Sequence, residues 1–361
     1  MKKILVYPFY SNPYQSLLYK EIKNNKDIEI KYLSDDISRF GGYILMAVLP
    51  YYLLKNRLLG FTIFHLHWVM FTPLSQSKVV QSISLVYVLF IIIFIKLIRY
   101  KLVWTIHNIL PHNTLTANDM FITKFLCKVS DAKIVHSQFT VTELENSGCD
   151  IHKITIIPHG NYISSYENRI TKREARNFLE IEQQAFVFLF FGEIKLYKGI
   201  DDLLKAFKSI SSTYKHVTLI IAGKVYEPSI QQLITDYSSE LGDKVTAHLR
   251  HIKDKEIQYF MNAANVVVYP FKKITTSGSV LLALSFGKSI IYPKLGALQE
   301  LHEAVGFPYE SSDSDGLLKS MQRAIASDKA MLPKEKVAYT YAKSLSWNNI
   351  AEQTIAVYYQ L

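Results

Sequence analysis

Two loops in the second half of the sequence contain residue types that bind phosphate groups. The first, residues 192–199, directly follows an apolar run and contains two glycines and two lysines. Gly192 lets the chain turn tightly out of a strand, and Gly199 precedes a helical pattern whose first N–H groups have no partner within the helix. Lys195 and Lys198 lie between them, where two ammonium groups can hold a diphosphate. An ordinary strand-to-helix loop with surface lysines is the alternative.

The second loop is rich in hydroxyl groups and directly precedes an apolar helical pattern at residues 280–286. Its members are Thr275, Thr276, Ser277, Gly278 and Ser279. Hydroxyls, a glycine and the free backbone N–H groups of a helix start form a second anion site. Plain helix capping explains the same residues, but two such loops in one half of the chain favour binding of a diphosphate.

Histidines follow two apolar runs in the first half of the chain. His67 ends one predicted strand, and His107 and Asn108 follow the next. Because parallel strands end at the same edge of a sheet, these side chains can converge there. We expect His107 to project into a cleft where the chain leaves the sheet, with Asn108 beside it and His67 nearby. A purely structural role is the alternative for each histidine.

Length and charge limit the classes of protein that fit. The 361 residues exceed one ordinary core and predict two domains. The chain has 41 Lys and Arg against 31 Asp and Glu, a net charge of +10, which suits a phosphorylated substrate, an anionic lipid surface or nucleic acid. Nucleic acid is not expected, because no arginine-rich block or zinc-finger spacing is present. A solvated lysine-rich surface also explains the charge.

Cysteine usage and the start of the sequence point to a protein that stays inside the cell. Cys127 and Cys149 are the two cysteines, too few for a disulfide framework, and they suit a reducing compartment. The apolar run after Met1 is too short for a signal peptide. We expect no metal, because the histidines lack the carboxylate or thiolate spacing of a zinc site.

Two apolar stretches raise the question of a membrane. Val79–Ile95 carries no charge, but it is shorter than the ~20 residues of a spanning helix. A strand starting at Leu102 follows it, so we expect a buried or membrane-grazing helix. Tyr43–Phe61 mixes apolar residues with Lys55 and Arg57 and fits either a lipid interface or a helix that covers a sheet. We therefore expect a protein peripheral to the inner face of the cell membrane.

Short apolar runs alternate with helical patterns and predict an α/β fold of two Rossmann-like, doubly wound domains that face each other across a cleft. The strand candidates are Lys3–Tyr7, Ile28–Leu33, Ile63–His67, Leu102–Thr105, Lys133–His136, Ile154–Ile157, Phe186–Phe191, Val217–Ala222, Val245–Leu249, Asn265–Tyr269 and Ser289–Tyr292. We expect one domain over residues 1–160 and a second domain, which contains both phosphate-binding loops, over 161–345, with a linker near 158–170. The terminal helix, 346–361, is expected to pack back on the first domain.

Loop 192–199 resembles the donor loop of the GT-B glycosyltransferases, specifically the group 1, family 4-like branch, and the resemblance covers nearly the whole chain. In that family a Gly-Arg pair and a Lys-Gly pair hold the diphosphate of a nucleotide sugar. Gly192 and Lys198 match, while Glu193 occupies the arginine position and Lys195 is the expected substitute. The resemblance implies a nucleotide sugar as co-substrate and no further cofactor, with lysines in place of a metal.

Other parts of the sequence extend the resemblance, with one departure. His107 resembles the family histidine near the transferred sugar. The resemblance implies that His107 orients the sugar or the nucleophile and serves as the base if the reaction inverts, with Asn12, His67 and Asn108 on the sugar or acceptor side. Residues 158–160 resemble the Pro-x-Gly that ends the first domain. The family usually has two glutamates, one for the sugar and one for the ribose, but Ile274 and Leu282 occupy these positions. Glu300 is the candidate replacement carboxylate, and the stereochemical outcome stays open.

These features predict transfer of a hexose from a nucleotide-diphosphate sugar to a lipid-linked or polysaccharide acceptor in the synthesis of exopolysaccharide, capsule or O-antigen. The alternatives are a sugar-nucleotide 2-epimerase, which shares the architecture, and a non-catalytic sugar-nucleotide-binding partner, which the missing glutamates favour. A nicotinamide-dependent dehydrogenase is not expected, because the first turn, residues 7–13, lacks the Gly-x-Gly-x-x-Gly motif.

Overall fold

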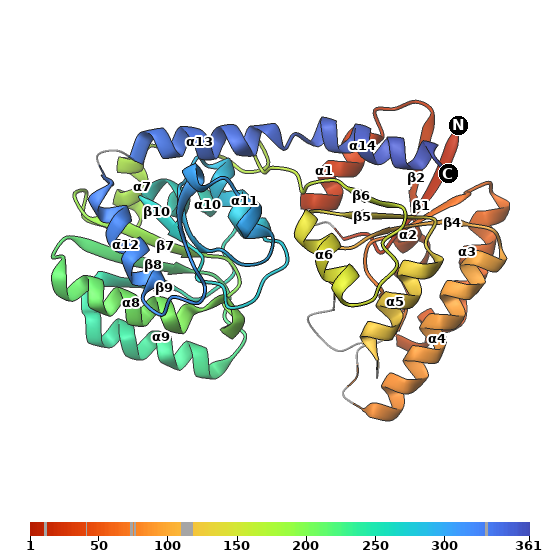
Figure 1. Ribbon diagram of the computed structural model, residues 1–361, viewed down its shortest axis with the longest axis horizontal. Coiled ribbons are helices and arrows are strands. Elements are labelled where there is room, and N and C mark those ends of the chain that lie inside the picture. Colours follow the sequence, from red (N-terminus) through yellow and green to blue (C-terminus); the bar gives the residue numbers. More distant parts are fainter. Residues whose placement is uncertain (11–12, 41, 73–74, 76, 110–117, 329–330) are drawn as a thin grey trace. The chain divides into compact units, whose positions relative to one another are not determined.

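The computed structural model describes residues 1–361 except 11–12, 41, 73–74, 76, 110–117 and 329–330 (Figure 1). The chain forms two compact units. Unit 1 comprises Met1–His159 and Trp347–Leu361, and unit 2 comprises Gly160–Ser346. The division falls one residue from the expected boundary, and the terminal helix belongs to unit 1. A cleft between the units stays a prediction.

Unit 1 contains a six-stranded parallel sheet in the order β2-β1-β3-β4-β5-β6. Its strands are β1 (Lys2–Tyr7), β2 (Ile28–Tyr32), β3 (Ile63–Leu66), β4 (Lys101–Thr105), β5 (Ala132–Val135) and β6 (Ile154–Ile156). The chain leaves β1 for β2 and then returns to β3 on the other side of β1. Apolar runs of this kind are typical of parallel strands buried on both faces, and the predicted doubly wound fold is confirmed.

Helices cover both faces of this sheet. They are α1 (Pro13–Ile22), α2 (Leu33–Ile37), α3 (Gly42–Leu58), α4 (Lys78–Leu97), α5 (Asp119–Val129), α6 (Gln138–Asn146) and α14 (Trp347–Tyr359). Buried side chains of α2, α3, α4 and α5 share one core cluster, and those of α1 and α14 share another. Lys2 Nζ donates to Tyr358 O at 2.8 Å, which fastens the terminal helix beside the first strand.

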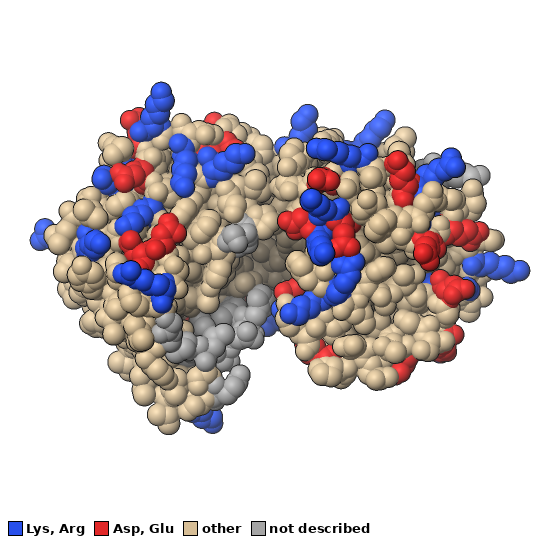
Figure 2. Space-filling model, turned by 180° about the vertical axis from the view of Figure 1, so that it is seen from behind, with Lys and Arg blue, Asp and Glu red and all other residues tan. Residues whose placement is uncertain are grey.

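Helix α4 is long and apolar enough to cross a membrane, and it is the one such helix in the described part of the chain. It connects β3 to β4, two neighbouring strands paired at Ile63 and Lys101, so it lies on one face of the sheet. Val88 and Ile91 on its inner side belong to the core. Only 28% of its most apolar window is buried, and the lower end of unit 1 in Figure 2 is tan and blue without red.

Unit 2 contains a second six-stranded parallel sheet, in the order β12-β11-β10-β7-β8-β9. Its strands are β7 (Phe186–Phe191), β8 (Val217–Ala222), β9 (Val245–His248), β10 (Val266–Val268), β11 (Ile290–Pro293) and β12 (Gly306–Tyr309). The edge strand β12 was not predicted, because it is short and contains Gly306 and Pro308. Both residues are acceptable at an edge, and a β-carbon at Gly306 would lie 2.0 Å from Ile290 O.

The helices of unit 2 pack around β7, whose six residues are all buried. They are α7 (Lys172–Phe178), η1 (Leu196–Lys198), α8 (Ile200–Thr213), α9 (Pro228–Leu241), η2 (Gly242–Lys244), η3 (Asp254–Glu256), α10 (Ile257–Ala263), α11 (Gly278–Ser285), η4 (Gly296–Glu300), η5 (Glu303–Val305), α12 (Gly316–Ala326) and α13 (Met331–Ser344). The chain runs from β7 outward to β9 and then returns to β10 on the other side of β7. The strand order therefore reverses between β7 and β10.

Candidate functional site

The two phosphate-binding loops predicted from the sequence flank the reversal of strand order in unit 2. Residues 192–199 follow β7, and residues 269–278 follow β10, its neighbour in the sheet. In doubly wound sheets, ligands bind at the carboxyl edge where two such loops diverge. The loops are also in contact, because Lys272 N donates to Tyr197 O at 2.8 Å.

Gly199 allows this close contact between the loops. Its φ of +74° lies in the left-handed region, which glycine adopts at no steric cost. A β-carbon at this position would lie 1.9 Å from Pro270 O, far inside van der Waals contact. The helix α8 starts directly after Gly199, so this residue fixes the position of the lysine that precedes it.

Lys198 and Ser279 meet beside Gly192. A β-carbon built on Gly192 would lie 3.8 Å from Lys198 Nζ and 3.6 Å from Ser279 Cβ. The absence of a side chain at Gly192 therefore leaves a space bordered by an ammonium group from one loop and a hydroxyl-bearing residue from the other. A phosphate needs this combination of positive charge and hydrogen-bond donors.

The ammonium group of Lys198 has no ion pair or hydrogen bond among the described residues. Burial lowers its pKa from 10.5 to about 8, because the charged form is poorly solvated, and the carboxylate of Glu193 offsets this only in part. Holding a cation without a direct partner costs stability. Such an arrangement is typical of a site that awaits an anionic ligand.

Lys195 is held differently from Lys198. Its Nζ lies 2.8 Å from Glu193 Oε2 and 4.9 Å from the centre of the Tyr226 ring, and Tyr226 Oη donates to Glu193 Oε1 at 2.9 Å. Burial acts to lower the pKa of Lys195, but the bond and charge of Glu193 outweigh it and raise this pKa. Glu193, which occupies the arginine position of the family, thus partly neutralises the charge of Lys195, the expected substitute for that arginine.

The start of α11 is organised by its own hydroxyl groups. Ser277 Oγ accepts from Val280 N at 3.4 Å and caps the helix, and it lies 2.9 Å from Ser279 Oγ. Tyr269, at the end of β10, donates its hydroxyl to Ser279 O at 2.6 Å. These bonds fix the start of α11, whose Ser279 side chain lies beside Gly192.

The remaining residues of this loop contact other segments of unit 2. Thr275 O accepts from Ala297 N at 3.1 Å, and Thr276 lies half-buried in the same loop. A β-carbon at Gly278 would lie 2.9 Å from Tyr162 Oη. Tyr162 was not predicted as a site residue, because nothing in the linker sequence links it to this loop.

Ile274 and Leu282 occupy the positions of the two glutamates that the family usually has, so neither carboxylate is present at its usual place. Leu282, on α11, is buried with 6% of its surface exposed, so the ribose-binding position is part of the core. Ile274 O packs against Gly296, where a β-carbon would lie 2.2 Å away. Glu300 is exposed at the end of η4, whose first turn is bonded to the hydroxyl-rich loop. Its role as a replacement stays a prediction.

In unit 1, a histidine follows each of four neighbouring strands. His67 follows β3, His107 follows β4, His136 follows β5 and His159 lies beyond β6. The sequence pointed to His67 and His107; His136 and His159 were missed as site residues, although they repeat the same pattern of a histidine after a strand. The predicted Asn12 lies outside the described residues, and Asn108 is half-buried beside His107.

Three of these imidazoles are hydrogen-bonded in series, and the carbonyl acceptor at one end of the series determines which ring nitrogens carry the protons. His136 Nδ1 lies 2.9 Å from Ile157 O and must donate to it, because a carbonyl oxygen only accepts. His136 Nε2 then accepts from His107 Nδ1 at 3.2 Å, and His107 Nε2 accepts from His67 Nδ1 at 3.1 Å. Tyr19 Oη donates to His67 Nε2 at 2.6 Å. Every bond in the series therefore runs in the same direction.

Burial and the neighbouring imidazoles lower the pKa values of His107 and His67 well below 6.5, so both are neutral at pH 7. Both ring nitrogens of His107 are already bonded, so it can take up a proton only if one of these bonds breaks. Its ring also stacks on Trp68 at 4.3 Å between centroids. The geometry favours a rigid, positioning role for His107 over that of a base.

A second histidine network ties the terminal helix to the sheet. His65 Nδ1 lies 2.6 Å from Tyr358 Oη and 3.0 Å from Tyr19 Oη, and His65 Nε2 lies 2.8 Å from Thr105 Oγ1. All of these side chains are buried. No group of three or more His, Cys, Asp and Glu in the described part of the chain is arranged to hold a metal ion. The two networks share Tyr19 and so hold His67, His107 and His136 in place. These three residues and His159 are called the histidine row below.

Comparison with known proteins agrees with this geometry. A family model described as "Glycosyl transferases group 1" matches residues 185–327, all in unit 2. The chain is 27% identical over 235 residues to the lipopolysaccharide 1,2-N-acetylglucosaminetransferase of Salmonella typhimurium, an alignment that spans 62% of this chain and 61% of that enzyme. It is 23% identical over 291 residues to the GDP-mannose:glycolipid 4-beta-D-mannosyltransferase of Xanthomonas campestris, with 76% and 75% covered.

Solved structures show the same fold. Anabaena HepE, crystallised in complex with UDP and glucose, matches with a TM-score of 0.74 at 18% identity, and the match covers 100% of both chains. At this level of identity the likeness concerns the fold alone. Together, the family model and the related transferases show that unit 2 is similar to the group 1 glycosyltransferases, and the solved structures show that the chain has the GT-B fold.

Proposed function

We propose that the chain transfers a hexose from a nucleotide-diphosphate sugar to a lipid-linked or polysaccharide acceptor in the synthesis of a cell-surface glycan. The observation that carries this proposal is the space beside Gly192, where Lys198 Nζ and Ser279 approach each other at the reversal of strand order. A diphosphate bound there would meet an ammonium group, hydroxyl groups and the N-terminus of α11.

The chemical step is an exchange at the anomeric carbon. The bond from this carbon to the β-phosphate oxygen breaks, its electron pair stays on the phosphate, and an acceptor oxygen forms the new bond while losing its proton. Lys198 and the start of α11 would stabilise the charge that develops on the departing diphosphate, the kind of interaction that often contributes most to catalysis. In this proposal the cations of the chain take the place of a metal, and no further cofactor takes part.

The first unit would present the sugar and the acceptor. Here His107 is proposed to position the sugar through its rigidly held ring, with His67 and Asn108 nearby. Asn12 keeps its proposed place on the acceptor side from sequence alone. The proton of the acceptor would pass to the departing diphosphate, which gains the electron pair of the broken bond, because neither nitrogen of His107 is available without breaking a hydrogen bond.

A lipid-linked acceptor is supported by the named relatives. The Salmonella enzyme acts on lipopolysaccharide and the Xanthomonas enzyme on a glycolipid. We therefore propose a cytoplasmic protein that is peripheral to the inner face of the cell membrane, where such acceptors are extended. The relatives use different sugars, so the donor is left unassigned.

A non-catalytic sugar-nucleotide-binding partner is the second candidate, because Ile274 and Leu282 replace two carboxylates of the family. A 2-epimerase is the third.

Thermal-shift measurements with UDP-, GDP- and dTDP-sugars identify the donor, and an assay with and without a lipid-linked acceptor follows. Acceptor-dependent release of nucleotide supports the transferase. Release without any acceptor indicates an epimerase, and binding without turnover indicates the non-catalytic partner.

A further inference from the structure

One side of α4 exposes a row of large apolar side chains. They are Val79, Ile83, Val86, Phe90, Ile93 and Leu97, each between 46% and 72% exposed. Their spacing alternates between four and three residues, which places them along a single side of the helix. The opposite side of α4 is buried in the core. A soluble surface rarely carries so long an apolar row without a partner.

Helix α3 adds to this surface. Its exposed apolar residues are Tyr43, Ile44, Tyr51, Leu54 and Leu58. The two helices are bonded to each other, since Tyr87 Oη of α4 donates to Met46 O of α3, and Arg57 Nε of α3 donates at 3.0 Å to the carbonyl oxygen of Ile98, directly after α4. Both helices cover the same face of the sheet. The exposed apolar residues of α3 and α4 are called the apolar face below.

The segment of the chain that carries the apolar face contains charges of one sign. Residues 37–118, which include α3 and α4, contain no Asp or Glu, although the chain has 31 of them. The same segment contains seven basic residues: Arg39, Lys55, Arg57, Lys78, Lys96, Arg99 and Lys101. Asp131 from outside the segment pairs with Lys96 and lies 3.8 Å from Lys101. Lys55, Lys78 and Arg99 form no ion pair among the described residues.

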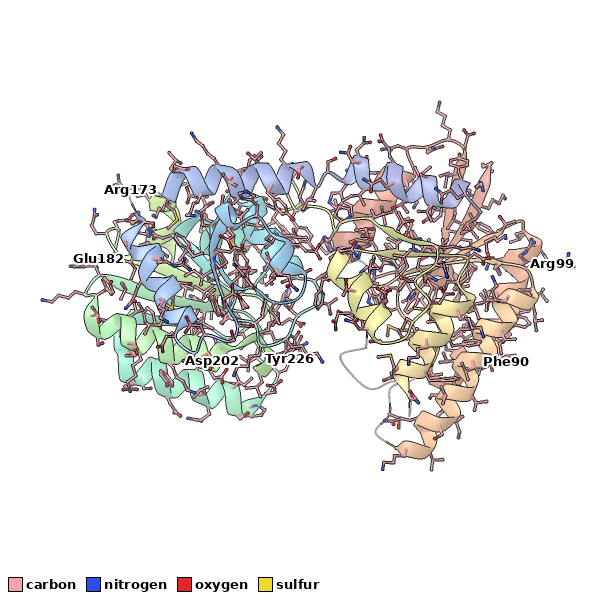
Figure 3. The ribbon with its side chains drawn as sticks, in the orientation of Figure 1. Phe90, Arg99, Arg173, Glu182, Asp202 and Tyr226 are labelled. Atoms are coloured by element: carbon pink, nitrogen blue, oxygen red, sulfur yellow. The ribbon has the colours of Figure 1, made fainter. Side chains whose placement is uncertain are left out.

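Apolar side chains flanked by cations match the surface of a bilayer that contains anionic lipid. The apolar residues can enter the boundary between headgroups and acyl chains, while the lysines and arginines meet the phosphates. Phe90 and Arg99 lie on the same outer edge of unit 1 in Figure 3, and the lower end of unit 1 in Figure 2 is tan and blue without red.

We infer that the apolar face docks unit 1 on an anionic phospholipid bilayer, with α3 and α4 lying on the membrane and not crossing it. Crossing is excluded by the buried inner side of α4, which packs on the sheet between β3 and β4. The inference deepens the proposed function, on which it rests for a lipid-linked acceptor, but it concerns binding and not turnover.

The test is co-sedimentation of the full chain with vesicles of phosphatidylcholine, alone or with about 30% phosphatidylglycerol. The double variant Val86→Gln/Phe90→Gln removes two exposed apolar residues from α4. The matched control, Phe178→Gln/Leu332→Gln, removes two residues of similar exposure from unit 2, 55% and 60% against 68% and 49%. We expect tight binding only to anionic vesicles, about tenfold weaker for the α4 variant and unchanged for the control.

Three results would overturn the inference: no binding of the unmodified chain to anionic vesicles, equal binding of both variants, or equal loss in both. Concentration-dependent dimers that only the α4 variant abolishes, without vesicle binding, would instead assign the apolar face to a second copy of the chain. Thermal stabilisation by nucleotide sugars, measured on the same proteins, tests the proposed function separately from membrane binding. It should be equal in all three proteins.

Discussion

The unpaired ammonium group of Lys198 should make donor use depend on pH. With a pKa of about 8, this group loses its proton as the pH rises above 8, while an ordinary lysine stays charged to about pH 10. If the charge holds the diphosphate, kcat/KM should fall about tenfold per pH unit above 8. At pH 9, about one tenth of the maximal value should remain.

Substitution separates Lys198 from other groups that titrate. Lys198→Arg keeps a cation throughout this range, so its kcat/KM should be lower but flat between pH 8 and 10. Lys198→Ala should lower turnover by orders of magnitude without unfolding the protein. In Lys195→Met the fall near pH 8 should persist, because Glu193 raises the pKa of Lys195.

Replacing Lys198 with an uncharged residue should stabilise the protein. The unfolded chain binds a proton at Lys198 up to about pH 10.5, whereas the folded chain releases it at about 8, so the cost of the buried charge is fully present below pH 8. The lowered pKa corresponds to at most about 3 kcal/mol, and partial exposure reduces this to roughly 1–2 kcal/mol. Lys198→Met should be more stable by that amount in urea unfolding at pH 7.

The assay is donor-dependent product formation from pH 6 to 10 at subsaturating donor, with circular dichroism to verify folding. A fall in kcat/KM near pH 8 that remains in Lys198→Arg would refute the reasoning, because the titrating group would then lie elsewhere. Lower stability of Lys198→Met would show that the ammonium group has a partner that the geometry does not reveal.

Three further substitutions test the arrangement of the loops and of the histidine row. Gly199→Ala should destabilise the protein by more than ~3 kcal/mol in thermal unfolding because its β-carbon clashes with a carbonyl group. Gly242→Ala, also at positive φ but with nothing within 4 Å, should cost only the backbone strain of about 1–3 kcal/mol. His107→Ala should keep nucleotide binding in calorimetry but lower kcat about 100-fold; an unchanged kcat would remove the proposed role. Glu193→Gln should free Lys195 and tighten donor binding about threefold to tenfold, and weaker binding would contradict a diphosphate beside this loop.

Much of the fold follows from local sequence. The all-apolar run Phe186–Phe191 forms a strand buried on both faces, and the alternation of such runs with helical patterns predicted both doubly wound sheets. Strand β12 was missed because Gly306 and Pro308 argue against a strand in isolation, and only its position at the edge of the sheet makes them acceptable.

The site was less accessible to sequence reasoning. Lys198 and Ser279 lie on loops far apart in the chain, and only the order of the strands brings them to one edge. The pairing of Lys195 with Glu193 depends on the extended backbone at Ile194, which pairs with Val225 and places side chains two residues apart on the same side. Nothing in the sequence predicts it.

The histidine row has a similar explanation. A single histidine after a strand is uninformative, and the pattern is visible only when four successive strands are known to be neighbours. The hydrogen bond from His136 Nδ1 to Ile157 O fixes the proton positions of the three hydrogen-bonded histidines. It joins residues 21 positions apart in the sequence. Such a bond cannot be read from the types of the residues alone.

A crystal structure of the chain with a bound nucleoside diphosphate would decide whether unit 2 holds the donor as proposed. The β-phosphate should lie within hydrogen-bonding distance of Lys198 Nζ and of the first N–H groups of α11, in the space beside Gly192. A diphosphate bound away from this space, with Lys198 directed toward solvent, would contradict the account.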